Sequence, residues 1–237
     1  MNDPRQRLIV ALDVSTAAAA QKIVAAVGDS AFTYKVGMQL YTAEGPTVVR
    51  DLVAAGRRVF LDLKYHDIPN TVAAAVREAS ALGVSMLTVH SSGGGKMLRA
   101  AVEAATPNRA LRVLAVTVLT SMDERDLEKI GVHGQVVDQV LRLAALALTD
   151  GCHGVVASAR EASQLRNRLG NEFAIVTPGV RPAGVAHEDQ ARVVTPEEAI
   201  AAGATHIVVG RPITAAADPA AEARAILEEM NAVTSSR

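Results

Sequence analysis

The chain has 237 residues, of which 49% are hydrophobic, 21% are charged and only 3% are aromatic, and its formal net charge is -1. This length and apolar content fit a globular protein with a sizeable core. The near-zero charge argues against a nucleic-acid-binding surface, and the scarcity of rings argues against a surface that stacks bases. No apolar run is as long as a membrane span, and the polar start lacks a signal-peptide pattern. The lone Cys152 excludes an internal disulfide, which fits a reducing compartment. Together these features predict a cytoplasmic protein without nucleic-acid or membrane partners.

One pattern recurs along the chain: an apolar or β-branched run, then turn residues, then an Ala-rich amphipathic stretch. Strands are predicted over Leu8–Leu12, Thr33–Val36, Val59–Leu63, Met86–Val89, Arg112–Val118, Gly154–Ala157, Ala174–Thr177 and His206–Val209. Helices are predicted over Thr16–Val27, Glu44–Ala55, Pro69–Leu82, Lys96–Ala105, Gln135–Asp150, Glu161–Leu169, Pro196–Ala202 and Pro219–Ala232. An extra short helix, Asp123–Ile130, is expected in the fifth connection.

Eight strands that each lead into a helix predict an α/β protein with the (β/α)8 TIM-barrel architecture. The structural alternative is an open, doubly wound sheet. No Gly-x-Gly-x-x-Gly follows the first strand, which disfavours a dinucleotide-binding version of that alternative. Because the chain shows no Pro- or Ser-rich linker and no shift in composition, we expect a single domain over residues 1–237.

Charged residues gather at the carboxyl ends of the first three predicted strands. Asp13 ends the first strand, Lys35 lies at the end of the second, Asp62 and Lys64 end the third, and Asp67 follows in the next loop. Catalytic groups of (β/α)8 barrels come from these strand ends and the loops after them. This placement indicates a catalytic site, although a structural ion-pair network would use the same residue types.

Side-chain alternation refines the orientation of the third strand. Asp62 and Lys64 share one face with Phe60, while Leu61 and Leu63 point toward the helices. The inward face therefore changes from apolar to charged at the mouth of the barrel. Neighbouring carboxylates favour the ammonium form of Lys64, so we expect a proton donor and not a Schiff-base amine. Paired aspartates suit a divalent metal, but the two lysines oppose one, and we expect no metal.

The segment Asp62-Leu-Lys-Tyr-His-Asp-Ile-Pro-Asn-Thr71 closely resembles the signature of the orotidine 5'-phosphate decarboxylase family. Further segments agree with that family in order and spacing: Leu12-Asp13, Lys35-Val-Gly, Val89-His90, Leu119-Thr-Ser121, Thr177-Pro-Gly-Val-Arg181, Asp189-Gln190 and Val209-Gly-Arg211. The similarity covers nearly the whole chain and is closest to the bacterial homodimeric branch. It implies decarboxylation of orotidine 5'-phosphate to UMP in pyrimidine synthesis, without a cofactor.

The resemblance also implies a role for each site residue. Lys64 would protonate C6 of the pyrimidine, Asp62 would face the substrate carboxylate, and Lys35 and Asp13 would bind the ribose hydroxyls. The pyrimidine ring would be contacted by Thr120 and Ser121. The phosphate would be bound by Arg181, Gln190, Gly210 and Arg211. Three further residues would reach into the partner subunit's site: Asp67, Ile68 and Thr71. Each active site would then need both chains of a homodimer.

Apart from the resemblance, the residue types after the last predicted strand also suit a phosphate. Barrels frequently bind phosphate with the loops after the seventh and eighth strands, and Arg211 follows the eighth beside a glycine. The guanidinium of arginine donates paired hydrogen bonds to phosphate. The long segment Pro178–Ala191 is expected to act as a lid. His90, at the end of the fourth strand, either lines the site or packs beside it.

Two other functions remain open from the sequence. One is a magnesium-dependent sugar-phosphate member of the same superfamily, a keto-gulonate-phosphate decarboxylase or a hexulose-phosphate synthase. Those enzymes carry a carboxylate metal ligand where this chain has Lys35, which argues against that alternative. The other is a non-catalytic nucleotide-binding protein on a decayed barrel, against which the intact set of Asp62, Lys64 and Asp67 argues. With so few rings, a bound pyrimidine must be held by aliphatic side chains, hydroxyls and backbone groups.

Overall fold

A computed structural model describes residues 3–182 and 194–232, and its central feature is a closed barrel of eight parallel strands. Each strand pairs with its neighbours in the sequence, and the first strand pairs with the last. The strands are β1 (Leu8–Ala11), β2 (Thr33–Gly37), β3 (Arg58–Tyr65), β4 (Met86–His90), β5 (Arg112–Val116), β6 (Gly154–Val156), β7 (Ala174–Thr177) and β8 (His206–Val209). The predicted (β/α)8 barrel is confirmed, and the open sheet is excluded.

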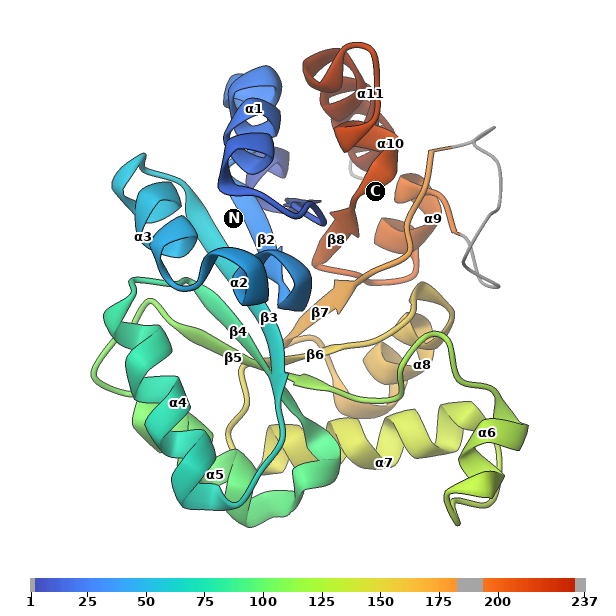
Figure 1. Cartoon of the computed structure of the whole chain (residues 1–237). Coiled ribbons are helices and arrows are strands. Elements are labelled where there is room, and N and C mark those ends of the chain that lie inside the picture. Colours follow the sequence, from blue (N-terminus) through green and yellow to red (C-terminus); the bar gives the residue numbers. More distant parts are fainter. Residues whose placement is uncertain (1–2, 183–193, 233–237) are drawn as a thin grey trace.

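Helices surround the barrel on its outer side (Figure 1). They are α1 (Ala17–Val27), α2 (Met38–Glu44), α3 (Thr47–Ala54), α4 (Pro69–Ala81), α5 (Gly94–Ala105), α6 (Glu124–Lys129), α7 (Val136–Thr149), α8 (Ala159–Leu169), α9 (Pro196–Ala201), α10 (Arg211–Thr214) and α11 (Pro219–Ala232). Short 3-10 helices lie at Pro4–Gln6, Gly28–Ser30 and Ser91–Gly93. Within residues 3–182 and 194–232, no helix combines the length and apolar character needed to cross a membrane.

Two helical regions differ from the sequence prediction. The helix predicted over Glu44–Ala55 is confirmed only from Thr47 to Ala54, as α3, and the preceding α2 was not predicted. Gly45 adopts a φ of 66°, which favours glycine, and Pro46 has no N–H to continue the helical hydrogen bonding. The second difference is the short helix α10 directly after β8, which the periodicity did not predict. Four residues are too few to show a helical repeat.

The apolar core has two parts, one inside the barrel and one between the barrel and its helices. The inner part is formed by inward side chains of alternating strand positions: Ile9, Ala11, Phe60, Met86, Leu114, Val176 and Val208. Leu61 belongs to the outer part and Leu63 packs against it, so the predicted facing of the third strand is confirmed. Gly154 permits the close approach of β6 to β7, because a Cβ there would lie 2.3 Å from the carbonyl oxygen of Ala174.

His206 is a buried titratable group on the inward face near the start of β8, two residues before Val208. Its Nδ1 lies 2.8 Å from the hydroxyl of Thr205. Burial, assisted by the positive charges of Arg58 and Arg7, lowers the pKa of His206 from 6.5 to about 4. The imidazole is therefore neutral in the folded protein at physiological pH.

This shift predicts that acid destabilises the fold through His206. Between pH 6.5 and about 4 the unfolded chain binds a proton at this residue that the folded chain does not bind. Stability is therefore lost as the pH falls, by about 2 kcal/mol from this residue at pH 5. Urea unfolding of His206→Gln should show a loss between pH 7 and pH 5 that is smaller by about that amount. The exposed His133 supplies the control, since His133→Gln should keep the wild-type pH dependence; equal pH dependence in both variants would contradict the prediction.

Candidate active site

A cavity of about 480 Å³ opens at the carboxyl ends of the strands. Most of the residues predicted for the site line it: Asp13, Lys35, Asp62, Lys64, Thr120, Arg181, Gly210 and Arg211. These residues come from both halves of the chain, because barrel closure brings β1 beside β8. The cavity therefore lies where barrels carry their active sites.

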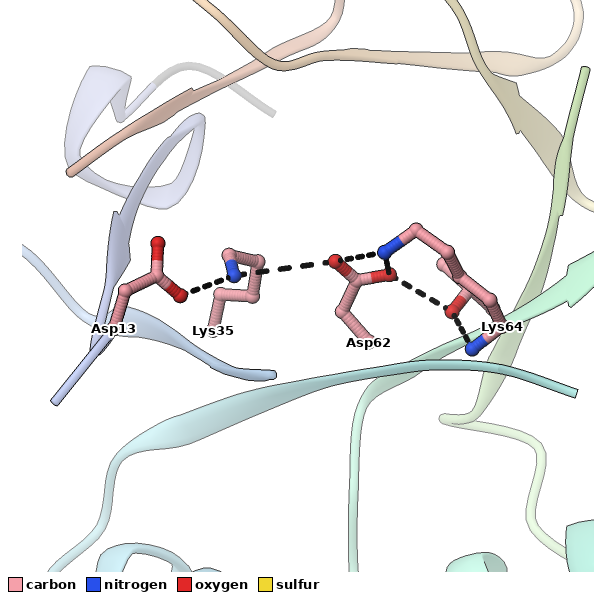
Figure 2. Close-up of polar contacts among 5 residues, drawn as sticks. Asp13, Lys35, Asp62 and Lys64 are labelled. Carbon is pink, nitrogen blue, oxygen red and sulfur yellow. Dashed lines mark hydrogen bonds and ion pairs between the residues drawn. The ribbon is translucent and has the colours of Figure 1, made fainter. Parts of the chain in front are cut away.

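Four side chains at one side of this cavity form a row of alternating charge (Figure 2). The ammonium of Lys35 lies 2.7 Å from Oδ1 of Asp13 and 3.9 Å from Oδ2 of Asp62. The ammonium of Lys64 donates to both carboxylate oxygens of Asp62 at 2.9 Å. Asp62 thus contacts both lysines and is itself largely shielded, with 15% of its side chain exposed. The row Asp13, Lys35, Asp62 and Lys64 is called the charge row below.

An irregular pairing of β3 with β4 shapes the end of the charge row. Residues 62–64 of β3 lie opposite the single residue Thr88 of β4. The Cα partners on either side are Leu61 with Leu87 and Tyr65 with Val89. Within this bulge Lys64 has a φ of 52°, the only positive φ of a non-glycine residue in the part of the chain that the structure describes. Such a backbone costs roughly 1–2 kcal/mol for an L-residue, so its surroundings must hold it in place.

Thr88 was not predicted from the sequence, although it touches two members of the charge row. Its hydroxyl oxygen accepts the backbone N–H of Lys64 at 2.9 Å and donates to Oδ1 of Asp62 at 3.0 Å. The residue is fully buried and lies on the inward face between Met86 and His90. The alternation of β4 places it inward, and a hydroxyl at an inward position of a buried strand is the signal that could have revealed it.

The two arginines predicted for phosphate line the cavity after β7 and β8. Arg181 follows β7 and is buried, whereas Arg211 is the exposed first residue of α10, directly after Gly210. The backbone N–H of Arg181 donates to the carbonyl oxygen of Val194 at 3.1 Å. Val194 also forms a β-bridge with Val180. Gln190 and most of the predicted lid Pro178–Ala191 lie outside the described residues.

The rest of the cavity wall is mainly aliphatic. Val116, Val118, Val156 and Val208 line it, together with Thr120 near the mouth. Phe60 is the one aromatic side chain among the described lining residues. A flat, partly polar molecule can pack against such a wall while its polar edges reach hydroxyl and backbone groups.

Four residues predicted for the site do not line the cavity within this chain: Asp67, Ile68, Thr71 and Ser121. All four are exposed, and 67% of Ile68 is accessible to solvent. The carboxylate of Asp67 accepts the N–H of Ile68 at 2.6 Å. Their roles, including the contribution of the first three to a partner subunit, stay predictions.

His90 packs beside the cavity and is not one of its lining residues. Its ring faces that of His66, with 5.5 Å between the ring centroids. Burial, with smaller contributions from the nearby His66 and Lys64, lowers the pKa of His90 below its ordinary value. His90 is therefore neutral at pH 7 and adds no charge next to Lys64.

No group of three or more His, Cys, Asp or Glu side chains within the described residues is arranged to hold a metal ion. The two carboxylates of the charge row, Asp13 and Asp62, are both in contact with the ammonium of Lys35. A positive charge in that position repels a divalent cation.

These features place the protein in the class of (β/α)8-barrel enzymes, because its polar cavity lies at the catalytic end of the barrel. Residues 6–226 match the model of the Orotidine 5'-phosphate decarboxylase / HUMPS family. The chain therefore belongs to this family.

Individual relatives are similar over almost their whole length. The orotidine 5'-phosphate decarboxylase of Halorhodospira halophila is 54% identical over 228 residues, which cover 95% of this chain and 96% of the relative. That of Anaeromyxobacter dehalogenans is 52% identical over 94% of this chain and 97% of its own. The crystal structure of orotidine 5'-phosphate decarboxylase from Lactobacillus acidophilus superimposes with a TM-score of 0.86 at 38% identity, covering 95% of this chain and 99% of the other.

The geometry of the charge row predicts that Asp62 is needed for stability as well as for any chemistry. Asp62→Asn removes the one carboxylate that contacts both lysines, and we expect a loss of about 1–3 kcal/mol in unfolding free energy. Asp29 is a suitable control, because it is 88% exposed and pairs with Arg57 at 3.7 Å. Asp29→Asn should change stability by less than about 0.5 kcal/mol. Urea denaturation measures both, and equal effects would show that Asp62 is not a structural centre.

Proposed function

We propose that this protein decarboxylates orotidine 5'-phosphate to UMP and carbon dioxide without a metal or cofactor. The observation that carries the proposal is the charge row in a cavity that Arg181 and Arg211 also line. Relatives that are 52–54% identical over nearly the full chain bear the name orotidine 5'-phosphate decarboxylase. Their similarity supports the same reaction here.

The chemical step falls to Lys64. Loss of carbon dioxide breaks the bond from C6 to the carboxyl carbon and leaves the electron pair on C6. A fixed ammonium group stabilises that developing negative charge and then donates its proton to C6. The two hydrogen bonds from Lys64 to Asp62 support this role, because they keep the ammonium in one position at the mouth of the barrel.

Asp62 is proposed to face the carboxylate of the substrate. Two unit charges about 4 Å apart interact by about 4 kcal/mol at an effective dielectric constant near 20. This repulsion acts on the bound substrate and is relieved as carbon dioxide leaves. We rank it below stabilisation by Lys64, because an ammonium acts directly on the charge that develops in the transition state.

Substrate binding is divided along the cavity. Asp13 and Lys35 are proposed to bind the ribose hydroxyls, and Thr120 and Ser121 to contact the polar edge of the pyrimidine. The aliphatic wall supports this division, since it can pack against the flat face of the base while hydroxyl groups read its edge. Hydrogen bonds, and not ring stacking, would then select the base.

The phosphate is assigned to Arg181 and Arg211 with Gly210 and Gln190. Arg181 and Arg211 follow neighbouring strands, and both line the cavity. Guanidinium groups suit phosphate because they donate parallel hydrogen bonds. Binding energy gained at the phosphate can stabilise a closed site and so assist the reaction at a distance. The predicted lid, Pro178–Ala191, lies mostly outside the described residues, and its closure stays a prediction.

The position of Lys35 supports the absence of a metal from the reaction. Its ammonium contacts the same carboxylates that a divalent cation would need. A magnesium-dependent sugar-phosphate reaction is therefore less compatible with this site. The aligned Asp62 and Lys64 likewise fit a working enzyme better than a decayed nucleotide-binding barrel.

The enzyme is proposed to act as a homodimer with shared active sites. Asp67, Ile68 and Thr71 lie in the exposed stretch at the end of β3 and the start of α4, and would extend into the site of the partner. The large exposed side chain of Ile68 supports a contact there, because burying it against a second subunit is favourable. The cytoplasmic location stays a prediction from composition.

Replacing Lys64 tests the reaction and its proton donor together. The wild-type protein should convert orotidine 5'-phosphate in the presence of EDTA, followed by ultraviolet absorbance. Lys64→Ala should lower turnover at least about 1,000-fold, because both charge stabilisation and proton transfer are lost. Lys129→Ala is the control, since this lysine is exposed, pairs with Asp126 three residues before it and is not part of the charge row.

The outcomes separate the two parts of the proposal. Near-normal turnover by Lys64→Ala would remove its role as proton donor. Activity of the wild-type protein only on a sugar phosphate, and only with magnesium, would overturn the function itself.

Mixing two inactive variants tests the shared site. Lys64→Ala and Asp67→Ala each inactivate every site of their own homodimer, but a hybrid dimer keeps one intact site. An equal mixture should recover about a quarter of wild-type activity after subunit exchange. Lys64→Ala mixed with Lys35→Ala should recover nothing, because both residues belong to the same half of a site. Exchange shown by labelled subunits without any recovery in the first mixture would count against the shared site.

A further inference from the structure

The hydroxyl of Thr88 joins the two residues that are proposed to carry the chemistry. We propose that Thr88 is a positioning residue, which holds the Lys64 ammonium in its working orientation by tying the Lys64 backbone to the Asp62 carboxylate. The inference rests on the proposed decarboxylase function and adds a residue outside the ten-residue signature.

Hydrogen bonds close a ring around these three residues. The N–H of Lys64 donates to the Thr88 hydroxyl oxygen at 2.9 Å, and that hydroxyl donates to Oδ1 of Asp62 at 3.0 Å. The Lys64 ammonium completes the ring, because it donates to the same Oδ1 at 2.9 Å. Lys64 is therefore connected to Oδ1 of Asp62 in two ways. Its backbone N–H is connected through the Thr88 hydroxyl, and its ammonium bonds to the same oxygen directly.

The group at this position has two hydrogen-bonding tasks. It must accept a hydrogen bond from an N–H and donate one to a carboxylate at the same time, which a hydroxyl does and an aliphatic side chain does not. Thr88 is fully buried and is the only β4 residue opposite residues 62–64. Its replacement would leave the Lys64 N–H without this acceptor in the bulge where the backbone has a φ of 52°.

The expected consequence is loss of orientation and not loss of substrate binding. A left-handed backbone at a residue other than glycine persists only where surrounding contacts determine it. Once the Thr88 contacts are removed, residues 62–64 can relax and the ammonium of Lys64 samples positions away from C6. Arg181 and Arg211 lie after β7 and β8, on other strands, so phosphate binding should be retained.

The experiment compares Thr88→Val, which keeps the shape but removes the hydroxyl, with Thr88→Ser, which keeps the hydroxyl. Thr88→Val should lower kcat about 10- to 100-fold, the factor expected for a lost hydrogen bond to a charged group. Its KM and its calorimetric Kd for UMP should change less than about threefold, because ground-state contacts remain. Thr88→Ser should keep kcat within about threefold of wild type.

Thr33→Val is the matched control. Thr33 is likewise fully buried in a barrel strand, and its hydroxyl has no hydrogen-bond partner among the described residues. The same chemical change there should leave kcat, KM and UMP binding unaltered. Should Thr88→Val not fold, Thr88→Ala removes the hydroxyl without placing a second methyl group against Asp62, and the same measurements apply.

The outcomes are distinct. A wild-type protein that does not turn over orotidine 5'-phosphate overturns the proposed function and this inference with it. An active wild type with unchanged kcat in Thr88→Val, or with equal losses in kcat and UMP affinity, overturns only the positioning role. A selective loss of kcat that Thr88→Ser restores supports it.

Discussion

The carboxylate of Asp62 is the charge on which the mouth of the barrel depends. It accepts two hydrogen bonds from Lys64, lies within 3.9 Å of the Lys35 ammonium and accepts the hydroxyl of Thr88. Two ammonium groups this close together would repel each other without it. Because the four charges of the row cancel, the site can be strongly polar while the whole chain has a net charge of only -1. Net charge therefore carries no information about the electrostatics of this cavity.

The closed barrel makes the left-handed backbone of Lys64 tolerable. A closed sheet has no edge at which β3 can shift, and β3 is paired with β2 as far as Asp62 and with β4 at Leu61 and Tyr65. The bulge at residues 62–64 is therefore held on both sides by regular pairing. The barrel thus contributes the stability that offsets a backbone cost of roughly 1–2 kcal/mol at Lys64.

The sequence predicted the parts of this site that depend on one strand at a time. Alternation within β3 correctly assigned Phe60 and Asp62 to the interior and Leu61 to the helices. The bulge and the contact with Thr88 depend on the register between two strands, which no single periodicity contains. The break at Gly45 was missed for another reason, because the predicted helix was started at Glu44 although Gly45-Pro46 is a turn signal in the sequence. Asp67 and Ile68 are exposed and do not line the cavity of their own chain, so their roles came only from family resemblance.

The division of the cavity explains why a chain with few aromatic residues can suit a nucleotide. Valines on strands and loops give the cavity an apolar wall. Such a wall favours burial of a flat ring but does not select one base over another. Specificity is then left to groups at either end, where unpaired polar atoms make a wrong ligand costly. Such a site can discriminate only if its polar groups stay in place when the ligand is absent. The ring formed by Asp62, Lys64 and Thr88 supplies such fixed groups, since its hydrogen bonds lie entirely within the chain.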